Sequence, residues 1–165
     1  MKRFELSSTE AQALEGDFRL LISGIDLRNI NQATSLSGLP AQSGCYFWIM
    51  CSDSRRYKIY IGRTRSILKR VMDYANDFQV HAPNDYKLRF FQESMSRGFP
   101  TAAFDLYFTD VPVEQCKARE KELLRQFSPL INTLPPPTEH ERDLIRRAFE
   151  EYYRSSTARH LTGDA

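Results

Sequence analysis

Four side chains of this 165-residue chain are of the types that could together hydrolyse a phosphodiester bond. The reaction needs a deprotonated water aimed in line, neutralisation of charge on the phosphoryl oxygens, and help for the departing alkoxide. Glu120 is the candidate acid for holding one Mg²⁺ or Mn²⁺ ion per active site, with water and phosphate oxygens as the other ligands. Arg70 is permanently charged and forked, which suits the negative charge that develops on phosphorus. Tyr46 and Tyr60 are then left as candidates for the general base.

The tyrosines need activation to serve in this way. A free phenol has a pKa of about 10 and is a poor base at neutral pH, but a metal ion and an arginine nearby would lower that pKa. We favour Tyr60 as the base, with Tyr46 and Tyr74 orienting water and phosphate. The sequence does not decide the order of the tyrosines, and a covalent phosphotyrosine intermediate is chemically open as well.

Glu120 stands out because of its place on a predicted helix. Over about residues 113–127, an apolar stripe is formed by Cys116, Leu123, Leu124 and Phe127, and Glu120 lies on that stripe. Burial of an unpaired ionised group is costly, so a glutamate there is expected to be paired, protonated or holding a cation.

A hairpin and a helix are expected to position the tyrosines and the arginine. Residues 45–51 and 58–61 are rich in β-formers, and the polar residues 52–56 between them predict an antiparallel hairpin. A period of two places Gly44, Tyr46, Trp48 and Met50 on one face, which Tyr60 can share. A helix is predicted over about 66–76, and its spacing would align four residues along one flank beside the tyrosine strand: Arg63, Ile67, Arg70 and Tyr74.

Basic residues are concentrated in the same region. From residue 55 to residue 70 there is no acidic residue, although the whole chain has a net charge of only +2. Such a concentration favours phosphate backbones as a ligand, while a solvated basic face without a ligand is the alternative. The candidate nucleic-acid-binding residues, besides Arg70, are Arg55, Arg56, Lys58, Arg63, Arg65 and Lys69.

Five elements in order carry a resemblance to a known family. These are Gly44-Cys45-Tyr46, Tyr60-Ile61-Gly62, Arg70, Glu120 and Asn132. Together they resemble the GIY-YIG nuclease family over roughly Leu39 to Asn132, and five elements in the right order are far more specific than either triplet alone. The departures are Cys45, where the family usually has an aliphatic residue, and Arg63, where some members have a lysine that, unlike arginine, could carry a proton.

The resemblance implies both a fold and a site. The fold would be α/β in the broad sense (α+β), with a small, mainly antiparallel three-stranded sheet flanked by helices. The active site would comprise Tyr46, Tyr60, Arg70, Tyr74 and Glu120, and the chemistry would be direct hydrolysis. Gly44, Gly62 and Asn132 would support the structure, Asn132 through hydrogen bonds to the backbone.

The remaining elements complete the expected organisation. We expect a nuclease-like core at 38–134, an N-terminal extension at 1–37 and a C-terminal helical extension at 135–165. Short helices are predicted at 8–14, behind a Ser7/Glu10 capping box, and at 86–97, a loop at 78–85, a third strand at 103–109, and a long amphipathic helix after Thr138. The stretch 17–29 fits a helix broken at Gly24 about as well as it fits a strand.

Bulk properties exclude several classes of protein. No apolar run approaches the roughly 18 to 20 residues of a membrane helix, and the basic N-terminus lacks the apolar segment of a secretory signal, so we expect a cytoplasmic protein without membrane contact. Three cysteines without CxxC spacing indicate reduced thiols, not disulfides or a zinc site.

Three functions remain open at this point. The first is a metal-dependent DNA endonuclease, sequence- or structure-selective, with a restriction-like role as one option. The second is a nuclease module of a repair or mobile-element system guided by partners, and the third is a non-catalytic nucleic-acid-binding module of the same fold. Cutting both strands of a duplex with one site per chain would predict a homodimer on DNA.

Overall fold

The computed structural model describes residues 2–25, 38–75, 99, 101–133, 140, 143 and 147, with the backbone alone at 73–75. The expected loop at 78–85 and helix at 86–97 lie outside these residues, as does the C-terminal helix except at its three described positions. The described elements are η1 (Lys2–Phe4), α1 (Ser8–Asp17), β1 (Arg19–Ile25), β2 (Gly44–Ser52), β3 (Arg55–Thr64), α2 (Ile67–Ala75), β4 (Ala103–Asp110), α4 (Cys116–Phe127) and α5 (Leu130–Thr133).

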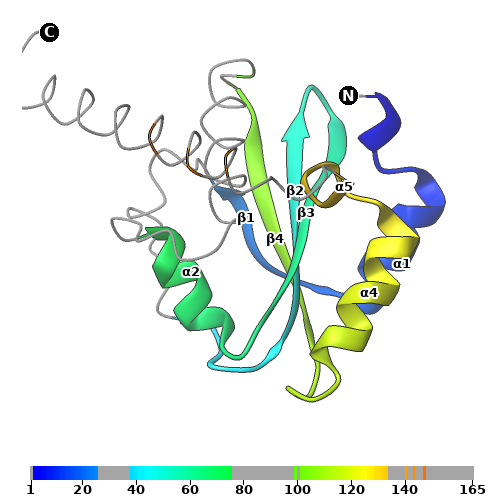
Figure 1. Ribbon diagram of the computed structural model, residues 1–165. Coiled ribbons are helices and arrows are strands. Elements are labelled where there is room, and N and C mark those ends of the chain that lie inside the picture. Colours follow the sequence, from blue (N-terminus) through cyan, green and yellow to red (C-terminus); the bar gives the residue numbers. More distant parts are fainter. Residues whose placement is uncertain are drawn as a thin grey trace, which may run out of the picture.

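The fold is α+β, with a four-stranded antiparallel sheet in the order β1-β4-β2-β3 (Figure 1). The prediction of three strands was therefore wrong. The additional strand, β1, comes from the stretch 17–29, whose apolar spacing fitted a helix and a strand equally well. Pairing with β4, from Arg19 opposite Phe108 to Ile25 opposite Phe104, is a tertiary contact that local periodicity could not reveal.

The β2–β3 hairpin is longer and its turn tighter than expected. Asp53 and Ser54 both have positive φ, of 50° and 63°, which is typical of the two-residue turn that matches the twist of paired strands. The strands consequently extend to Ser52 and from Arg55, into the segment expected to be the loop.

A bulge in β3 decides which way its side chains point. Trp48 is opposite Tyr60 and the next residue, Ile49, is opposite Lys58, so Ile59 is the extra residue on β3. In a regular strand Tyr60 and Lys58, two positions apart, would share a face. The bulge instead sends Tyr60 to the α2 face of the sheet and Lys58 to the face covered by α1.

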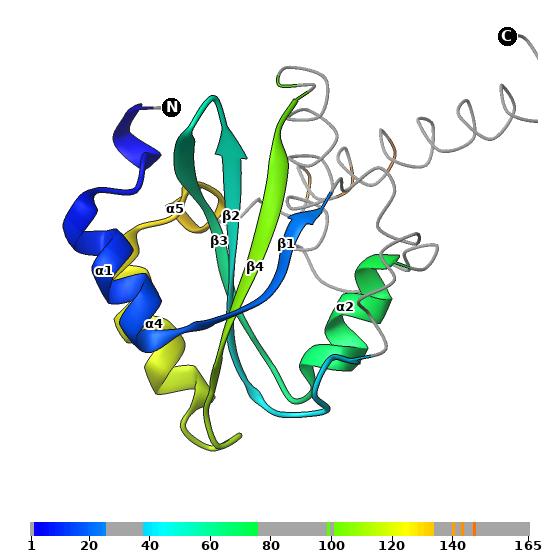
Figure 2. The same cartoon turned by 180° about the vertical axis from the view of Figure 1, so that it is seen from behind.

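Helices cover both faces of the sheet. Helix α2 lies on one side, and α1 and α4 lie together on the other (Figures 1 and 2). Each face has its own buried cluster, with Tyr46, Trp48, Tyr60, Ile67, Val71 and Phe108 among the residues on the α2 side, and Leu14, Phe18, Phe47, Ile61, Leu123 and Phe127 among those on the other. The predicted sharing of one face by Tyr46, Trp48, Met50 and Tyr60 is confirmed, because all four belong to the α2-side cluster.

The helix boundaries follow local signals. The predicted capping box at the start of α1 is present, with Ser7 and Glu10 each accepting a backbone hydrogen bond from the other. Helix α4 begins three residues later than expected, because the Pro112 carbonyl accepts the backbone N–H groups of Gln115 and Cys116 in a preceding turn. No helix within the described ranges is both long enough and apolar enough to cross a membrane.

Candidate active site

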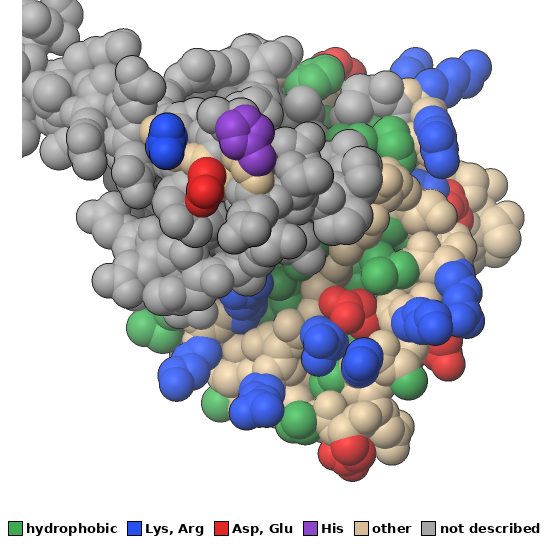
Figure 3. Space-filling model, viewed as in Figure 1, with side chains coloured by type: hydrophobic (Ala, Val, Ile, Leu, Met, Phe, Trp, Pro, Cys, Tyr) green, Lys and Arg blue, Asp and Glu red, His purple; other side chains and the backbone are tan. Residues whose placement is uncertain are grey.

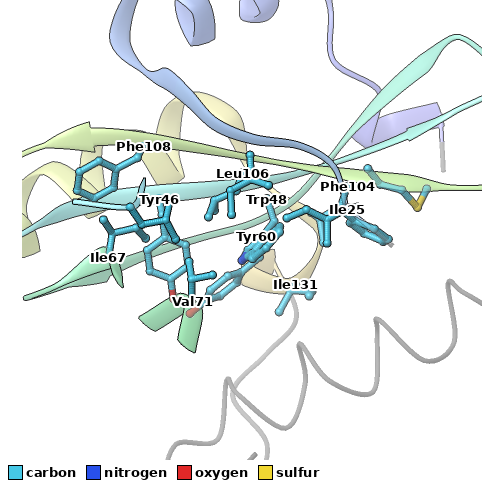
Figure 4. Packing of buried hydrophobic residues seen from close by; sticks show 14 of the residues in the cluster. Ile25, Tyr46, Trp48, Tyr60, Ile67, Val71, Phe104, Leu106, Phe108 and Ile131 are labelled. Carbon is cyan, nitrogen blue, oxygen red and sulfur yellow. The ribbon is translucent and has the colours of Figure 1, made fainter. Parts of the chain in front are cut away.

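Two tyrosines and an arginine meet on the α2 face of the sheet. The Arg70 guanidinium, from α2, donates a hydrogen bond through Nε to the Tyr46 hydroxyl over 3.0 Å. The Tyr46 and Tyr60 rings lie with centroids 6.0 Å apart and planes inclined by 58°. In Figure 4 the hydroxyl ends of both rings point toward the same place beside Val71. Tyr46, Tyr60 and Arg70 are called the tyrosine–arginine cluster below.

The glycine of the second triplet makes room for this cluster. Gly62 is opposite Tyr46 in the strand register. A β-carbon at Gly62 would lie 2.5 Å from the Tyr46 hydroxyl oxygen, 2.6 Å from Tyr46 Cζ and 2.9 Å from Cε1 of Tyr60. The bare backbone therefore lets the Tyr46 ring lie across β3, where its hydroxyl reaches Arg70.

Gly44, the glycine of the first triplet, is required by the close approach of β4. A β-carbon at Gly44 would collide with the backbone carbonyl oxygen of Thr109 and would lie 2.7 Å from the Phe108 ring. Gly44 thus allows β4 to approach β2, while Gly62 accommodates side chains.

Helix α2, which carries Arg70, is held at its first turn. The backbone N–H of Ile67 donates to the carbonyl of Gln42, and that of Leu68 to the carbonyl of Pro40. The Ser66 hydroxyl accepts from the N–H of Lys69. The loop that leads into β2 therefore fixes where the Arg70 side chain starts.

The expected flank of four residues on this helix does not form as predicted. Ile67 is fully buried in the core, and Arg63 belongs to β3, which continues to Thr64. Arg63 is opposite Cys45 in register and so points to the other face of the sheet, toward α4. Tyr74 lies in α2, but its side chain is outside the described part of the structure.

Glu120 lies on α4 and forms an ion pair with Arg63. Arg63 Nε donates to Glu120 Oε2 over 2.9 Å, and the Glu120 side chain is 23% exposed. Burial raises the pKa of Glu120 above its ordinary value, and the charge and hydrogen bond of Arg63 partly offset that rise. The expectation that this carboxylate would have a partner is confirmed, although the sequence did not indicate which residue that partner would be.

Glu120 suits a metal site in which the substrate supplies most of the ligands, not one built from protein side chains alone. Among the described residues there is no group of three or more His, Cys, Asp or Glu side chains that could hold an ion by themselves. Mg²⁺ often binds through one or two carboxylates and completes its shell with water and substrate phosphate. A partly exposed carboxylate with one oxygen engaged by arginine fits that mode, in which the substrate supplies ligands.

The cluster and Glu120 approach β3 from opposite faces. Arg63, the partner of Glu120, follows directly after Gly62, over which the Tyr46 ring lies. Since β3 is the last strand in the sheet order, its outer edge lies between α2 and α4, and Figure 1 looks onto that edge. Strand β3 therefore separates the two groups, with the Tyr46 and Tyr60 rings buried on one side and the partly exposed Glu120 on the other.

The basic residues between positions 55 and 70 fall into two groups. At the turn end of the hairpin, the first group pairs with N-terminal acids, namely Arg55 with Glu5 (3.8 Å), Arg56 with Glu15 (3.2 Å) and Lys58 with Glu10. Arg56 also donates to the Tyr107 hydroxyl over 2.6 Å.

Lys58 departs furthest from its predicted role in binding nucleic acid. Its side chain is only 7% exposed and is engaged with Glu10, so its charge is used inside the fold. The bulge at Ile59 is the physical reason, because it turns Lys58 toward α1.

The other end of the basic run is open to solvent. Arg63, Arg65 and Lys69 are exposed around the turn that connects β3 to α2. Within the described part of the chain, neither Arg65 nor Lys69 takes part in an ion pair. Figure 3 shows basic side chains gathered over this end of the molecule.

Asn132 completes the edge strand. Its side-chain oxygen accepts from the Ile61 N–H and its amide nitrogen donates to the Ile61 carbonyl, each over 2.9 Å. The side chain thus pairs with the β3 backbone much as a neighbouring strand would, which is support of the kind expected of it.

Comparison with protein families, with curated proteins and with solved structures finds no match to this chain.

The ion pair between Glu10 and Lys58 was not predicted from the sequence. Glu10 was assigned only to the capping box, and the structure gives it Lys58 as well, 48 positions away. Burial raises the pKa of Glu10, but hydrogen bonds from Lys58 and Ser7 outweigh it, so the pKa lies below the ordinary value. The sequence contains no local signal for this pairing.

Proposed function

We propose that this chain is a metal-dependent DNA endonuclease of the GIY-YIG type, which hydrolyses phosphodiester bonds. The observation that carries the proposal is the hydrogen bond from Arg70 to Tyr46 across Gly62, with Tyr60 in ring contact. These are the residues that the family resemblance selects, and they come from three separate elements. Both tyrosines also belong to the buried core on this face, so it is their combination with Arg70 that supports the proposal.

The tyrosine–arginine cluster supplies two of the requirements of hydrolysis. Arg70 offers a permanent forked charge to the phosphoryl oxygens, and Tyr46 accepts its Nε–H and so orients the guanidinium. We propose Tyr60, whose ring contacts that of Tyr46, as the group that takes the proton from water, with Tyr46 and Arg70 beside it. Tyr74, one turn after Arg70 on α2, is proposed to help orient water and phosphate.

Glu120 would hold the Mg²⁺ or Mn²⁺ ion, one per site. When bound, the ion would supply charge neutralisation at the phosphate and would lower the pKa of its neighbours. Arg63, Arg65 and Lys69, exposed near the start of α2, would contact the DNA backbone, and Arg55 and Arg56 could do so only in competition with Glu5 and Glu15. A homodimer would allow both strands of a duplex to be cut.

A second candidate is a nucleic-acid-binding module of this fold without catalysis. The ion pair between Arg63 and Glu120 is the observation that favours it, because a carboxylate neutralised by arginine has no requirement for a metal. A nuclease module that acts through partners within a repair or mobile-element system remains a variant of the first candidate.

Cleavage of supercoiled plasmid in the presence of Mg²⁺ or Mn²⁺ tests the proposal. We expect metal-dependent nicking or linearisation that falls at least about a hundredfold in Glu120→Gln and in Arg70→Ala. Glu122→Gln and Arg125→Ala are matched controls, because both residues are exposed on α4, and they should leave cleavage unchanged.

The opposite results are equally informative. Cleavage that persists in both active-site variants would show that these residues do not carry the chemistry. Salt-sensitive DNA binding by the wild type without any cleavage would instead favour the binding module.

A further inference from the structure

The pair formed by Arg63 and Glu120 is asymmetric. Only Nε of Arg63 donates to the carboxylate, and within the described residues neither of its terminal nitrogens donates a hydrogen bond. The arginine side chain is 50% exposed and that of the glutamate 23%. The guanidinium can therefore meet an incoming anion from solvent while it still contacts Glu120.

The same pair is poorly suited to bind a cation on its own. The carboxylate is neutralised by arginine, and the described residues provide no cluster of three acidic, histidine or cysteine side chains nearby or elsewhere. Affinity for hard divalent ions depends on how many charged oxygen ligands a site provides. A divalent ion would meet a single carboxylate with a positive charge already beside it.

The ionised form of Glu120 is stabilised by a positive partner, which in this structure is Arg63 at 2.9 Å. Burial disfavours its ionised form, and Arg63 is the group that compensates within the described structure. Removal of the arginine without a replacement would leave a partly buried charge uncompensated. A divalent ion is a suitable replacement, provided that something else attracts the arginine.

We propose that Arg63 is an exchangeable counter-ion, which makes binding of Mg²⁺ or Mn²⁺ at Glu120 conditional on a phosphodiester. The phosphate attracts the guanidinium, whose forked geometry matches its oxygens, and the vacated carboxylate together with phosphate oxygens then binds the ion. The exchange keeps both charges compensated, because the half-exposed guanidinium meets the phosphate while the divalent ion takes its place beside Glu120. The inference rests on the proposed function, in which Glu120 is the cation ligand.

Electron paramagnetic resonance of free Mn²⁺ tests this without relying on activity. All proteins carry Arg70→Ala so that DNA is not cut, and binding is measured with and without a short DNA duplex. Position 63 is compared as Arg63, Arg63→Gln and Arg63→Lys, and Glu120→Gln supplies the background that is subtracted. The control Arg125→Gln removes the same charge from an exposed position on α4.

The charge of Arg63 sets the expected result. Without DNA, Arg63→Gln should bind Mn²⁺ about tenfold more tightly than the parent, which is the order expected for removing a unit charge close to a divalent ion. Arg63→Lys should resemble the parent, and Arg125→Gln should change affinity less than about twofold because its charge is distant and screened. Addition of duplex should tighten binding by the parent far more than by Arg63→Gln.

Two results would overturn the inference, and only one of them would also overturn the nuclease proposal. Equal Mn²⁺ affinity of the parent and Arg63→Gln, with both dependent on Glu120, removes the counter-ion role and leaves the nuclease proposal intact. No binding that depends on Glu120 in any variant, with or without duplex, overturns both.

Discussion

Substitution of Gly62 by alanine tests the geometry of the tyrosine–arginine cluster most directly. The added carbon would lie 2.5 Å from the Tyr46 hydroxyl oxygen and 2.6 Å from its Cζ, whereas ordinary carbon contacts need roughly 3.5 Å. The Tyr46 ring must therefore move by roughly 1 Å. It has little room, because Tyr46 is 1% exposed and the neighbouring Tyr60 is 5% exposed. Overpacking of this kind costs about 1–3 kcal/mol of stability.

The displacement also predicts a loss of function. A shift of roughly 1 Å breaks the 3.0 Å hydrogen bond from Arg70 to Tyr46, and misplacement on that scale can reduce turnover about a hundredfold. Urea unfolding followed by fluorescence measures the stability change, because Trp48, the single tryptophan, is buried in the same cluster. Plasmid cleavage measures the second effect on protein that is still folded.

Gly16→Ala is the matched control, because it adds the same methyl group where nothing lies within 4 Å. In helix α1 the change should be neutral or stabilise by up to about 1 kcal/mol. If Gly62→Ala unfolds at the same urea concentration as the wild type, the packing argument is refuted. If it is destabilised but cleaves at the wild-type rate, the contact between Arg70 and Tyr46 does not serve catalysis.

Three further predictions concern stability and reactivity. Glu10→Gln should cost about 1–3 kcal/mol at neutral pH by removing the charge that pairs with buried Lys58. The fold lowers the pKa of Glu10, so its contribution to stability should be fully present above pH 4.5, the ordinary pKa of the carboxyl, and should be lost as pH falls through the folded pKa. Urea titrations of both proteins at several pH values would detect this loss. A stability difference that stays constant down to low pH would contradict the prediction. Asn132→Ala should cost about 2 kcal/mol and accelerate amide hydrogen exchange in the middle of β3, whereas unchanged exchange would show that the edge does not depend on it. Burial raises the pKa of Cys45 and of Cys51 to about 12, so both thiols should react with Ellman's reagent at least about a hundredfold more slowly at pH 8 than in unfolded protein. For the same reason the stability of the fold should be retained up to about pH 9 and decline as pH rises toward 12. Rapid labelling of the folded protein would count against this.

Local patterns were sufficient where one element decides its own structure. Runs of β-forming residues predicted β2 and β3, alternating apolar residues predicted β4, and the capping box predicted the start of α1. The burial of Glu120 on an apolar stripe correctly implied that it would be partnered, because the cost of burying a lone charge does not depend on the details of the fold.

The errors arose where a distant segment decides the outcome. The stretch that became β1 has no preference of its own until β4 pairs with it. Arg63 was placed on a helix flank because its spacing to Ile67 is helical, but pairing with β2 keeps it in β3 and turns it toward α4. Lys58 was predicted to bind nucleic acid, but the bulge at Ile59 turns it toward α1, and nothing in the sequence around it marks the extra residue.

The strand order also constrains how the protein can be made. β4 lies between β1 and β2, so the last of the described strands to be synthesised occupies a central place in the sheet. As the chain leaves the ribosome, the β2–β3 hairpin can close on its own, but β1 has no strand partner until β4 has been translated. Ile22 and Ile25, buried in the finished sheet, are left exposed during that interval. Slow translation or an early stop before β4 therefore yields a nascent chain whose β1 segment lacks its strand partner, which favours contact with a chaperone or another chain.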